Sequence, residues 1–299
     1  MFHGFGGCPQ QFFELGRRVA EYGFDVLLPL LPGHGLLAGQ TGQDDLSLLP
    51  GAKASESHYA ELALRMNEIM ARSPGTRVIV GFSLGGAISL NANLQANGLY
   101  DRQLLLSPML AIRGGAVIEG LTEFFGKIPG IRNIIVKPSA FRKQCKDWQT
   151  AGRAGFCDYR LRHAVPLIEL EDQNGELYRQ VTLATPIQIV GAGDERYISN
   201  NQLVSLTEQQ RQNGPISLCF MPDDVPHEML SAYENVGRDM YWLVDLLNNA
   251  VAFIVDGEFF PSANNLDQDP GVSPKCLISS AQPAAITAPR ADQSLRWPA

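Results

Sequence analysis

The sequence has few cysteines, no long apolar run and no excess of basic residues, and each shortage argues against a class of protein. Five cysteines in 299 residues, with no C-x-x-C pair, argue against a disulfide framework, a zinc site and thioredoxin-like chemistry. Lys and Arg number 24 against 31 Asp and Glu and form no cluster, which argues against nucleic acid as the main partner. No stretch approaches the roughly 18 unbroken apolar residues of a membrane-spanning helix.

The cysteines leave the cellular compartment open. Cys145 and Cys157 are close enough in the chain to pair in an oxidising compartment, but the sequence does not decide whether they do. No signal peptide precedes Phe2, and a cytoplasmic location is the expectation. The oligomeric state is left open as well.

Short apolar runs alternate with amphipathic patterns along most of the chain, and 45% of all residues are apolar. Near-continuous apolarity is typical of parallel strands covered on both faces, and it predicts strands at 25–30, 77–82, 103–107, 186–191 and 216–221. Three- and four-residue spacing predicts helices at 10–22, 57–70, 84–95, 200–212 and 228–249. The alternation indicates an α/β fold, with a mostly parallel sheet flanked by helices.

Two segments interrupt this alternation. Residues 108–185 are a long insertion with Gly and Pro turns, interpreted as a helical cap over the sheet, so that 1–107 and 186–256 form the core. Apolar residues within it suggest an acyl or aromatic ester of small to medium size as the substrate: Phe124, Phe125, Ile131, Ile134, Ile135 and Val136. Residues 257–299 carry six prolines and little periodicity, which predicts a disordered tail.

The segment Gly81-Phe82-Ser83-Leu84-Gly85 matches G-x-S-x-G, between a predicted strand and a predicted helix. This is the setting of a nucleophile elbow, a turn so sharp that side chains at 81 and 85 would collide with backbone. The alternative is a glycine-rich turn in which Ser83 only caps the helix. The context favours Ser83 as a nucleophile.

A serine hydroxyl needs a positioned base, and in this fold the chain order is Ser, acid, His. His227 is the only histidine after the strand at 186–191, so it is the expected base. Asp194, the first carboxylate after that strand, is the expected acid. The competing carboxylates are Glu195, Asp223 and Asp224.

The glycine-rich turn His3-Gly4-Phe5-Gly6-Gly7 can present backbone N–H groups to an anion. The Phe5 N–H, together with the Leu84 N–H at the start of the helix, would form an oxyanion hole. No Lys or Arg follows the glycines as in a phosphate-binding loop.

Five blocks taken together resemble the α/β-hydrolase superfamily, above all its carboxylesterases and monoacylglycerol-lipase-like members: HGFGG at 3–7, PLLPGHG at 29–35, GFSLGG at 81–86, GAGDE at 191–195 and VPHEM at 225–229. The resemblance covers about residues 2–250. It implies Ser83, Asp194 and His227 as a catalytic triad, with the Phe5 and Leu84 amides as oxyanion hole. It implies no metal and no organic cofactor. Since family members carry strands before the HG turn, the sheet is expected to lack its first strands.

The resulting expectation is a serine hydrolase that cleaves a small-molecule carboxylic ester, with a small to medium acyl group or of monoacylglycerol type, through an acyl-enzyme on Ser83. Two alternatives remain. The same triad can cleave a C–C bond, an amide or a thioester, which differ in contacts that the sequence does not define. The chain can also be a non-catalytic hydrolase-like protein or fragment.

Overall fold

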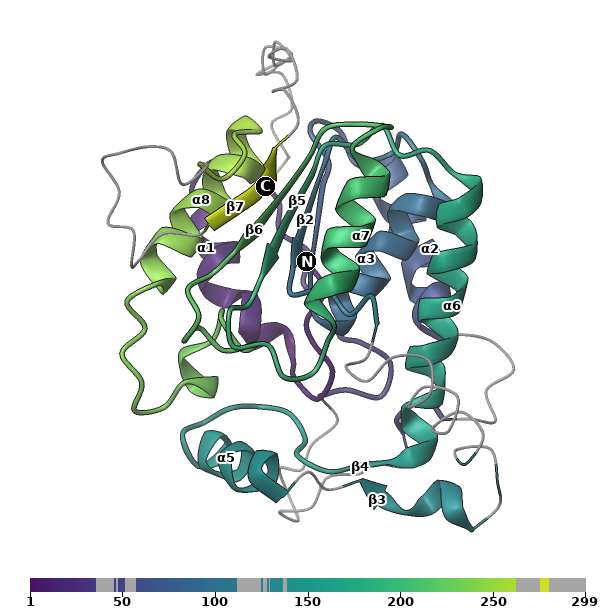
Figure 1. The fold of residues 1–299 in the computed structure, drawn as a ribbon, viewed down its shortest axis with the longest axis vertical. Helices are drawn as coiled ribbons and strands as arrows, with labels where there is room; N and C mark the ends of the chain where they lie inside the picture. Colours follow the sequence, from purple (N-terminus) through teal and green to yellow (C-terminus); the bar gives the residue numbers. More distant parts are fainter. Residues whose placement is uncertain are drawn as a thin grey trace, which may run out of the picture.

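The computed structural model describes residues 1–35, 46, 48–51, 58–111, 125, 128, 130–136, 139–261 and 275–279. At its centre is a five-stranded sheet of order β1-β2-β5-β6-β7, drawn in Figure 1. The strands are β1 (Val78–Phe82), β2 (Arg102–Leu106), β5 (Ile187–Gly191), β6 (Ile216–Phe220) and β7 (Lys275–Ser279). The first four pair in parallel and β7 is antiparallel to β6. The predicted α/β fold with a mostly parallel sheet is confirmed.

Helices cover both faces of this sheet (Figure 1). On one face lie α1 (Phe13–Ala20), which follows the short 3-10 helix η1 (Pro9–Phe12), and α8 (Leu243–Asp256). On the other lie α2 (His58–Arg72), α3 (Leu84–Gln95), α6 (Val165–Gln180) and α7 (Asn200–Gln210). Strand side chains therefore contribute to separate cores, for example Val80 on the α1/α8 face and Ile79 on the α2/α3 face. This double burial explains why the strands are continuously apolar.

The first 35 residues contribute little regular strand. Phe2 forms a single parallel bridge to Gly81 of β1. The strand expected at 25–30 is absent from this described segment, where the Met1 amino group donates to the Leu27 carbonyl at 2.7 Å. Apolarity alone does not make a strand, because a strand needs a neighbouring backbone to bond along its length.

The helix expected over 228–249 is also wrong in extent. The structure instead has a 3-10 turn, η4 (Ala232–Glu234), and then α8 from Leu243. Between them the Asn235 side chain donates to the carbonyls of Glu228 and Ser231, and Gly237 has a φ of +76°. Side-chain bonds to backbone and a left-handed residue compete with helix formation in this segment.

Residues 108–185 contain two different parts. The helix α6 packs beside the sheet, where the Asn174 amide donates to the Ala87 carbonyl and accepts from Asn91, both of α3. The described elements between residues 131 and 163 gather at one end of the molecule (Figure 1). They comprise η2 (Ile131–Asn133), β3 (Ile135–Val136), α5 (Ser139–Thr150), β4 (Tyr159–Arg160) and η3 (Leu161–His163), with β3 and β4 antiparallel.

Part of the segment expected to be a disordered tail is ordered. Residues 275–279 form β7 against β6, and a disulfide joins Cys219 to Cys276. The expectation failed because strand pairing and a disulfide are long-range interactions that the low periodicity of 257–299 does not reveal. Residues 262–274 and 280–299 lie outside the described residues. Across the described ranges, no helix combines the length and the apolarity needed to span a membrane.

Candidate functional site

Ser83 occupies a sharp turn between β1 and α3. Its φ of 53° and ψ of −120° place a non-glycine residue in a sparsely populated backbone region. A Cβ on Gly81 would lie 2.1 Å from the Gly85 carbonyl oxygen, and one on Gly85 would lie 2.0 Å from the Phe2 carbonyl oxygen. Only glycine fits these two positions, so the expected geometry of the turn is present and holds Ser83 at the end of the strand.

His227 lies on the loop that follows β6 and reaches Ser83. Its Nε2 is 3.0 Å from Ser83 Oγ, and its Nδ1 is 2.7 Å from Glu195 Oε2. The carboxylate accepts from Nδ1–H, which leaves Nε2 to accept the Ser83 proton. Burial lowers the pKa of His227, but the hydrogen bond and the charge of Glu195 outweigh burial and raise it above its ordinary value. The structure thus brings Ser83 and His227 together as expected.

The structure contradicts the choice of Asp194 as the partner of His227. The Asp194 carboxylate turns outward and pairs with Arg196, at 3.0 and 2.6 Å. Glu195 points inward, and its second oxygen accepts the backbone N–H groups of Tyr197 and Ile198. Burial raises the pKa of Glu195, but these bonds and the contact with His227 lower it below its ordinary value, so the group is ionised.

The backbone explains this exchange of roles. Residue 194 forms a parallel bridge to Pro226, its N–H donating to the Val225 carbonyl, so the chain continues in an extended form past the end of β5. Side chains alternate along extended backbone, and the next residue therefore faces the opposite side. The other two competing carboxylates, Asp223 and Asp224, are exposed. The sequence already places Glu195 among the candidates for the acid, because it directly follows Asp194.

The turn at residues 3–7 lies beside Ser83. The Gly4 N–H donates to Gln11 Oε1 at 2.8 Å, and the Gly6 N–H donates to His34 Nε2 at 3.2 Å. Between them, the Phe5 N–H has no acceptor within the described part of the chain, and neither has the Leu84 N–H at the start of α3. A Cβ on Gly4 would lie 3.3 Å from Ser83 Cβ, so this loop adjoins the candidate nucleophile.

Two buried histidines hold the same turn. His3 Nε2 accepts from the Leu31 N–H, so its Nδ1–H donates to the Gly4 carbonyl. His34 Nε2 accepts from Gly6, so its Nδ1–H donates to the Pro32 carbonyl. Both rings must be neutral to make these bonds. Burial lowers the pKa of His3 to about 3 and that of His34 to about 4.

A cavity of about 230 Å³ opens onto Ser83 and His227. We call it the central cavity. Apolar and aromatic side chains form much of its lining, including Phe5, Met109, Trp148, Phe156, Tyr159 and Leu167. Of the apolar residues expected to contact the substrate, Phe125, Ile131 and Ile134 do not line this cavity, and Phe125 and Ile134 are exposed. Phe124 and the side chains of Ile135 and Val136 lie outside the described part of the structure.

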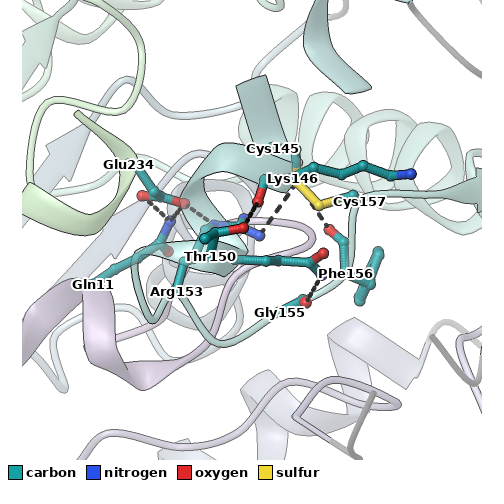
Figure 2. The surroundings of a disulfide bond; sticks show 10 residues. Gln11, Cys145, Lys146, Thr150, Arg153, Gly155, Phe156, Cys157 and Glu234 are labelled. Atoms are coloured by element: carbon teal, nitrogen blue, oxygen red, sulfur yellow. Dashed lines mark hydrogen bonds and ion pairs between the residues drawn. A yellow bond between two sulfur atoms is a disulfide. The ribbon is translucent and has the colours of Figure 1, made fainter. Parts of the chain in front are cut away.

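One wall of the central cavity is polar, which no sequence pattern indicates. Figure 2 shows Arg153, Glu234 and Gln11 pointing toward one another beside the disulfide Cys145–Cys157. Arg153 Nε is 2.7 Å from Glu234 Oε1, and Gln11 Nε2 donates to both Glu234 oxygens at 3.0 and 2.8 Å. The same Gln11 holds the Gly4 N–H through its Oε1. The network therefore connects the far wall to the turn beside Ser83.

No set of three or more His, Cys, Asp or Glu side chains in the described segments is arranged to hold a metal ion. The chemically distinctive features are instead the hydrogen-bonded side chains of Ser83, His227 and Glu195, the two amides without described acceptors, and the central cavity. Such a series can pass a proton away from a hydroxyl while the amides stabilise an oxyanion.

Comparisons with known proteins agree on the fold. The family model described as "Alpha/beta hydrolase family" matches residues 1–227. The monoacylglycerol lipase of Paleococcus ferrophilus shares 15% identity and a TM-score of 0.62, covering 85% of this chain and 92% of that one. A soluble variant of monoglyceride lipase from Saccharomyces cerevisiae shares 12% identity and a TM-score of 0.60, covering 84% and 83%. Among curated proteins, the comparison found no match.

Proposed function

Because the chain belongs to the alpha/beta hydrolase family, we propose that it is a serine hydrolase that cleaves carboxylic esters through an acyl-enzyme on Ser83. The observation that carries this proposal is the series Ser83 Oγ–His227 Nε2 at 3.0 Å and His227 Nδ1–Glu195 Oε2 at 2.7 Å. The distances suit general-base activation of the hydroxyl. Glu195 takes the role of the acid that the sequence assigned to Asp194.

In the acylation step, Ser83 Oγ attacks the ester carbonyl carbon while His227 Nε2 takes the hydroxyl proton. The carbonyl oxygen becomes an oxyanion, and the C–O bond to the alcohol then breaks as His227 returns the proton to the leaving oxygen. Glu195 keeps the imidazole in the required tautomer and stabilises its charged form. Ser83 is left carrying the acyl group.

The oxyanion is stabilised by the amides of Phe5 and Leu84. Both N–H groups are without an acceptor in the described structure, whereas the flanking Gly4 and Gly6 amides are occupied. A donor of this kind typically contributes about 2.7–4 kcal/mol of transition-state stabilisation. Water then attacks the acyl-enzyme with His227 as base, which releases the acid and restores Ser83.

The lining of the central cavity suits an uncharged ester with a small to medium acyl or alcohol group. At about 230 Å³ it lies below the range of about 300–1,000 Å³ that drug-sized ligands occupy. The structural neighbours described as monoacylglycerol and monoglyceride lipases support an ester substrate, including one of the monoacylglycerol type.

A fluorophosphonate probe and a series of p-nitrophenyl esters of increasing acyl length test this function. The protein should react covalently with the probe and hydrolyse the short and medium esters, and Ser83→Ala should lose both activities, with kcat lower by about 10⁴-fold or more. Labelling that persists in Ser83→Ala would contradict the assignment. Labelling without hydrolysis of any ester would favour a C–C bond, amide or thioester substrate, and absence of both would favour a non-catalytic protein.

The two disulfides bear on the compartment. Disulfides persist in oxidising surroundings and are rare in the cytosol. Cys145–Cys157 and Cys219–Cys276 together leave Cys8 as the one free cysteine, since all five cysteines are described. They favour an oxidising compartment over the cytoplasmic location expected from the sequence. Thiol titration of the protein, denatured without a reductant, should find one free thiol. Five free thiols would contradict the two disulfides.

A further inference from the structure

Arg153 lies in the wall of the central cavity opposite the strand ends. It belongs to the segment of residues 145–157, the end of α5 and the turn that follows, whose two ends the disulfide Cys145–Cys157 joins (Figure 2). The same segment brings Trp148 and Phe156 into the lining. Only 7% of the surface of Arg153 is exposed, and its guanidinium lies 5.5 Å from the centre of the Trp148 ring. The side chain is therefore fixed and buried at the cavity.

The guanidinium keeps donors that no described protein group uses. Arginine carries five N–H groups. Nε donates to Glu234 at 2.7 Å, and Nη1 contacts Cys145 Sγ at 3.7 Å. For Nη2, the residues that the structure describes offer no acceptor. It lies 3.9 Å from where a Cβ on Gly6 would stand, so these donors adjoin the turn that carries the Phe5 amide.

The charge around Arg153 is already balanced. Glu234, 2% exposed, pairs with Nε and also accepts from Gln11. Burial raises the pKa of Glu228, another cavity residue, which favours its uncharged form. A substrate carboxylate would add an uncompensated negative charge beside Glu234 and near the developing oxyanion. An uncharged oxygen would satisfy the Nη2 donors at no such cost.

We propose that Arg153 determines specificity by donating a hydrogen bond from Nη2 to an uncharged oxygen of the substrate, an ether, carbonyl or hydroxyl oxygen close to the ester that is cleaved. The inference rests on the proposed ester hydrolysis and names a substrate class for it: esters with a second, neutral oxygen acceptor. Esters with a purely hydrocarbon chain leave the buried donors unsatisfied and are poorer substrates.

Pairs of p-nitrophenyl esters test this, each pair having an all-methylene acyl chain and the same chain with one methylene replaced by an ether oxygen, at successive positions. Each kcat/KM is divided by the rate constant for hydroxide-catalysed hydrolysis of the same ester, to remove intrinsic reactivity. At one position the ether ester should be preferred about 10- to 100-fold, the range for a hydrogen bond to a charged group. Arg153→Met should abolish that preference.

Arg153→Met leaves Glu234 buried without its ion-pair partner, so the double variant Arg153→Met/Glu234→Gln is the second measurement, because it removes both charges. Arg179→Met, an exposed arginine on α6, is the matched control and should keep the preference. A wild-type protein without preference at any position, or a preference that survives in the Arg153 variants, would overturn the inference.

Binding separates this inference from the proposed chemistry. The methyl ketones that correspond to the paired esters, measured by calorimetry with Ser83→Ala, report recognition without turnover. The ether-containing ketone should bind about 10- to 100-fold more tightly than its all-carbon partner, and Arg153→Met should remove the difference. Equal binding of both ketones contradicts the role of Arg153 even if esters are cleaved, whereas inactivity toward every ester contradicts only the proposed function.

Discussion

The two walls of the central cavity are built in different ways. On one wall, Ser83 and His227 follow strands β1 and β6, and Glu195 follows β5, so a continuous parallel sheet sets their positions. The other wall is the segment of residues 145–157, which comprises the end of α5 and the turn after it. One disulfide, one buried ion pair and a few hydrogen bonds hold it, among them the bond from the Phe156 N–H to the Gly6 carbonyl at 3.0 Å. The first wall is positioned by many cooperative backbone hydrogen bonds, and the second by a small number of individually removable links.

This difference separates reaction from recognition. A wall tied to a sheet keeps reacting groups within the small tolerance that proton transfer demands. The segment 145–157 has no backbone hydrogen bond to the described parallel strands β1, β2, β5 and β6, so it can differ in length and sequence while the strand ends keep their positions. We therefore expect changes on the sheet side to affect kcat, and changes on the loop side to affect KM.

The largest expected effect is on the sheet side, at the two neighbouring carboxylates. Glu195→Gln should lower kcat by about 10⁴-fold, because it removes the charge that stabilises the protonated His227 and fixes its tautomer. Asp194→Asn should change kcat by no more than about twofold, because its ion pair with Arg196 is exposed. Steady-state kinetics on one ester would compare them, and the reverse ranking would restore Asp194 as the acid.

The two disulfides should differ in which property they control. Loop-closure entropy gives about 4 kcal/mol of stability for Cys219–Cys276, with 57 residues of separation, and about 3 kcal/mol for Cys145–Cys157, with 12. Replacing the first pair by serine should lower the unfolding free energy and leave KM within about twofold. Replacing the second should raise KM about tenfold, because the loop carries cavity residues.

Urea unfolding and ester kinetics on both double variants measure these two properties. The paired serine replacements are matched controls for each other, since each removes two sulfurs from a single site. If both variants raised KM equally, the expectation that KM depends specifically on the 145–157 segment would be wrong.

The smallest expected effect is a loss of stability in acid from His3 and His34. Their folded pKa values of about 3 and about 4 lie below the unfolded value of about 6.5, so the unfolded chain binds more protons between these limits. Stability is therefore full above pH 6.5 and falls as the pH drops toward 4 for His34 and toward 3 for His3. At pH 5 each histidine should cost about 2 kcal/mol. Unfolding of His34→Gln at pH 5 and pH 7 should show a smaller decrease than wild type, and an equal decrease would refute the assignment.

Sequence patterns predicted the sheet wall because its signals are local. The glycines at 81 and 85 are needed within a single turn, and the apolar runs of four parallel strands are each buried on both faces. Ser83 and His227 follow from strand ends and chain order. The choice between Asp194 and Glu195 depends on one alternation of side-chain direction, which the sequence alone does not fix.

The loop wall and the sheet edge escaped prediction because their signals are not local. Arg153 and Glu234 are 81 positions apart, and nothing near either residue indicates the other. The residues of β7 form a strand because they pair with β6. The apolar run at 25–30 pairs with no described strand and is not a strand itself. In both cases the partner, rather than the composition of the segment, decides the structure.

The antiparallel strand β7 also has a consequence for biosynthesis. When β6 leaves the ribosome, the residues that will cover its outer side are still more than fifty codons away. During that interval a nascent chain presents an uncovered strand with Cys219 on it, which invites association with other nascent chains. Producing the protein where thiols are oxidised should therefore improve its yield, since locking Cys276 in place ends that exposure.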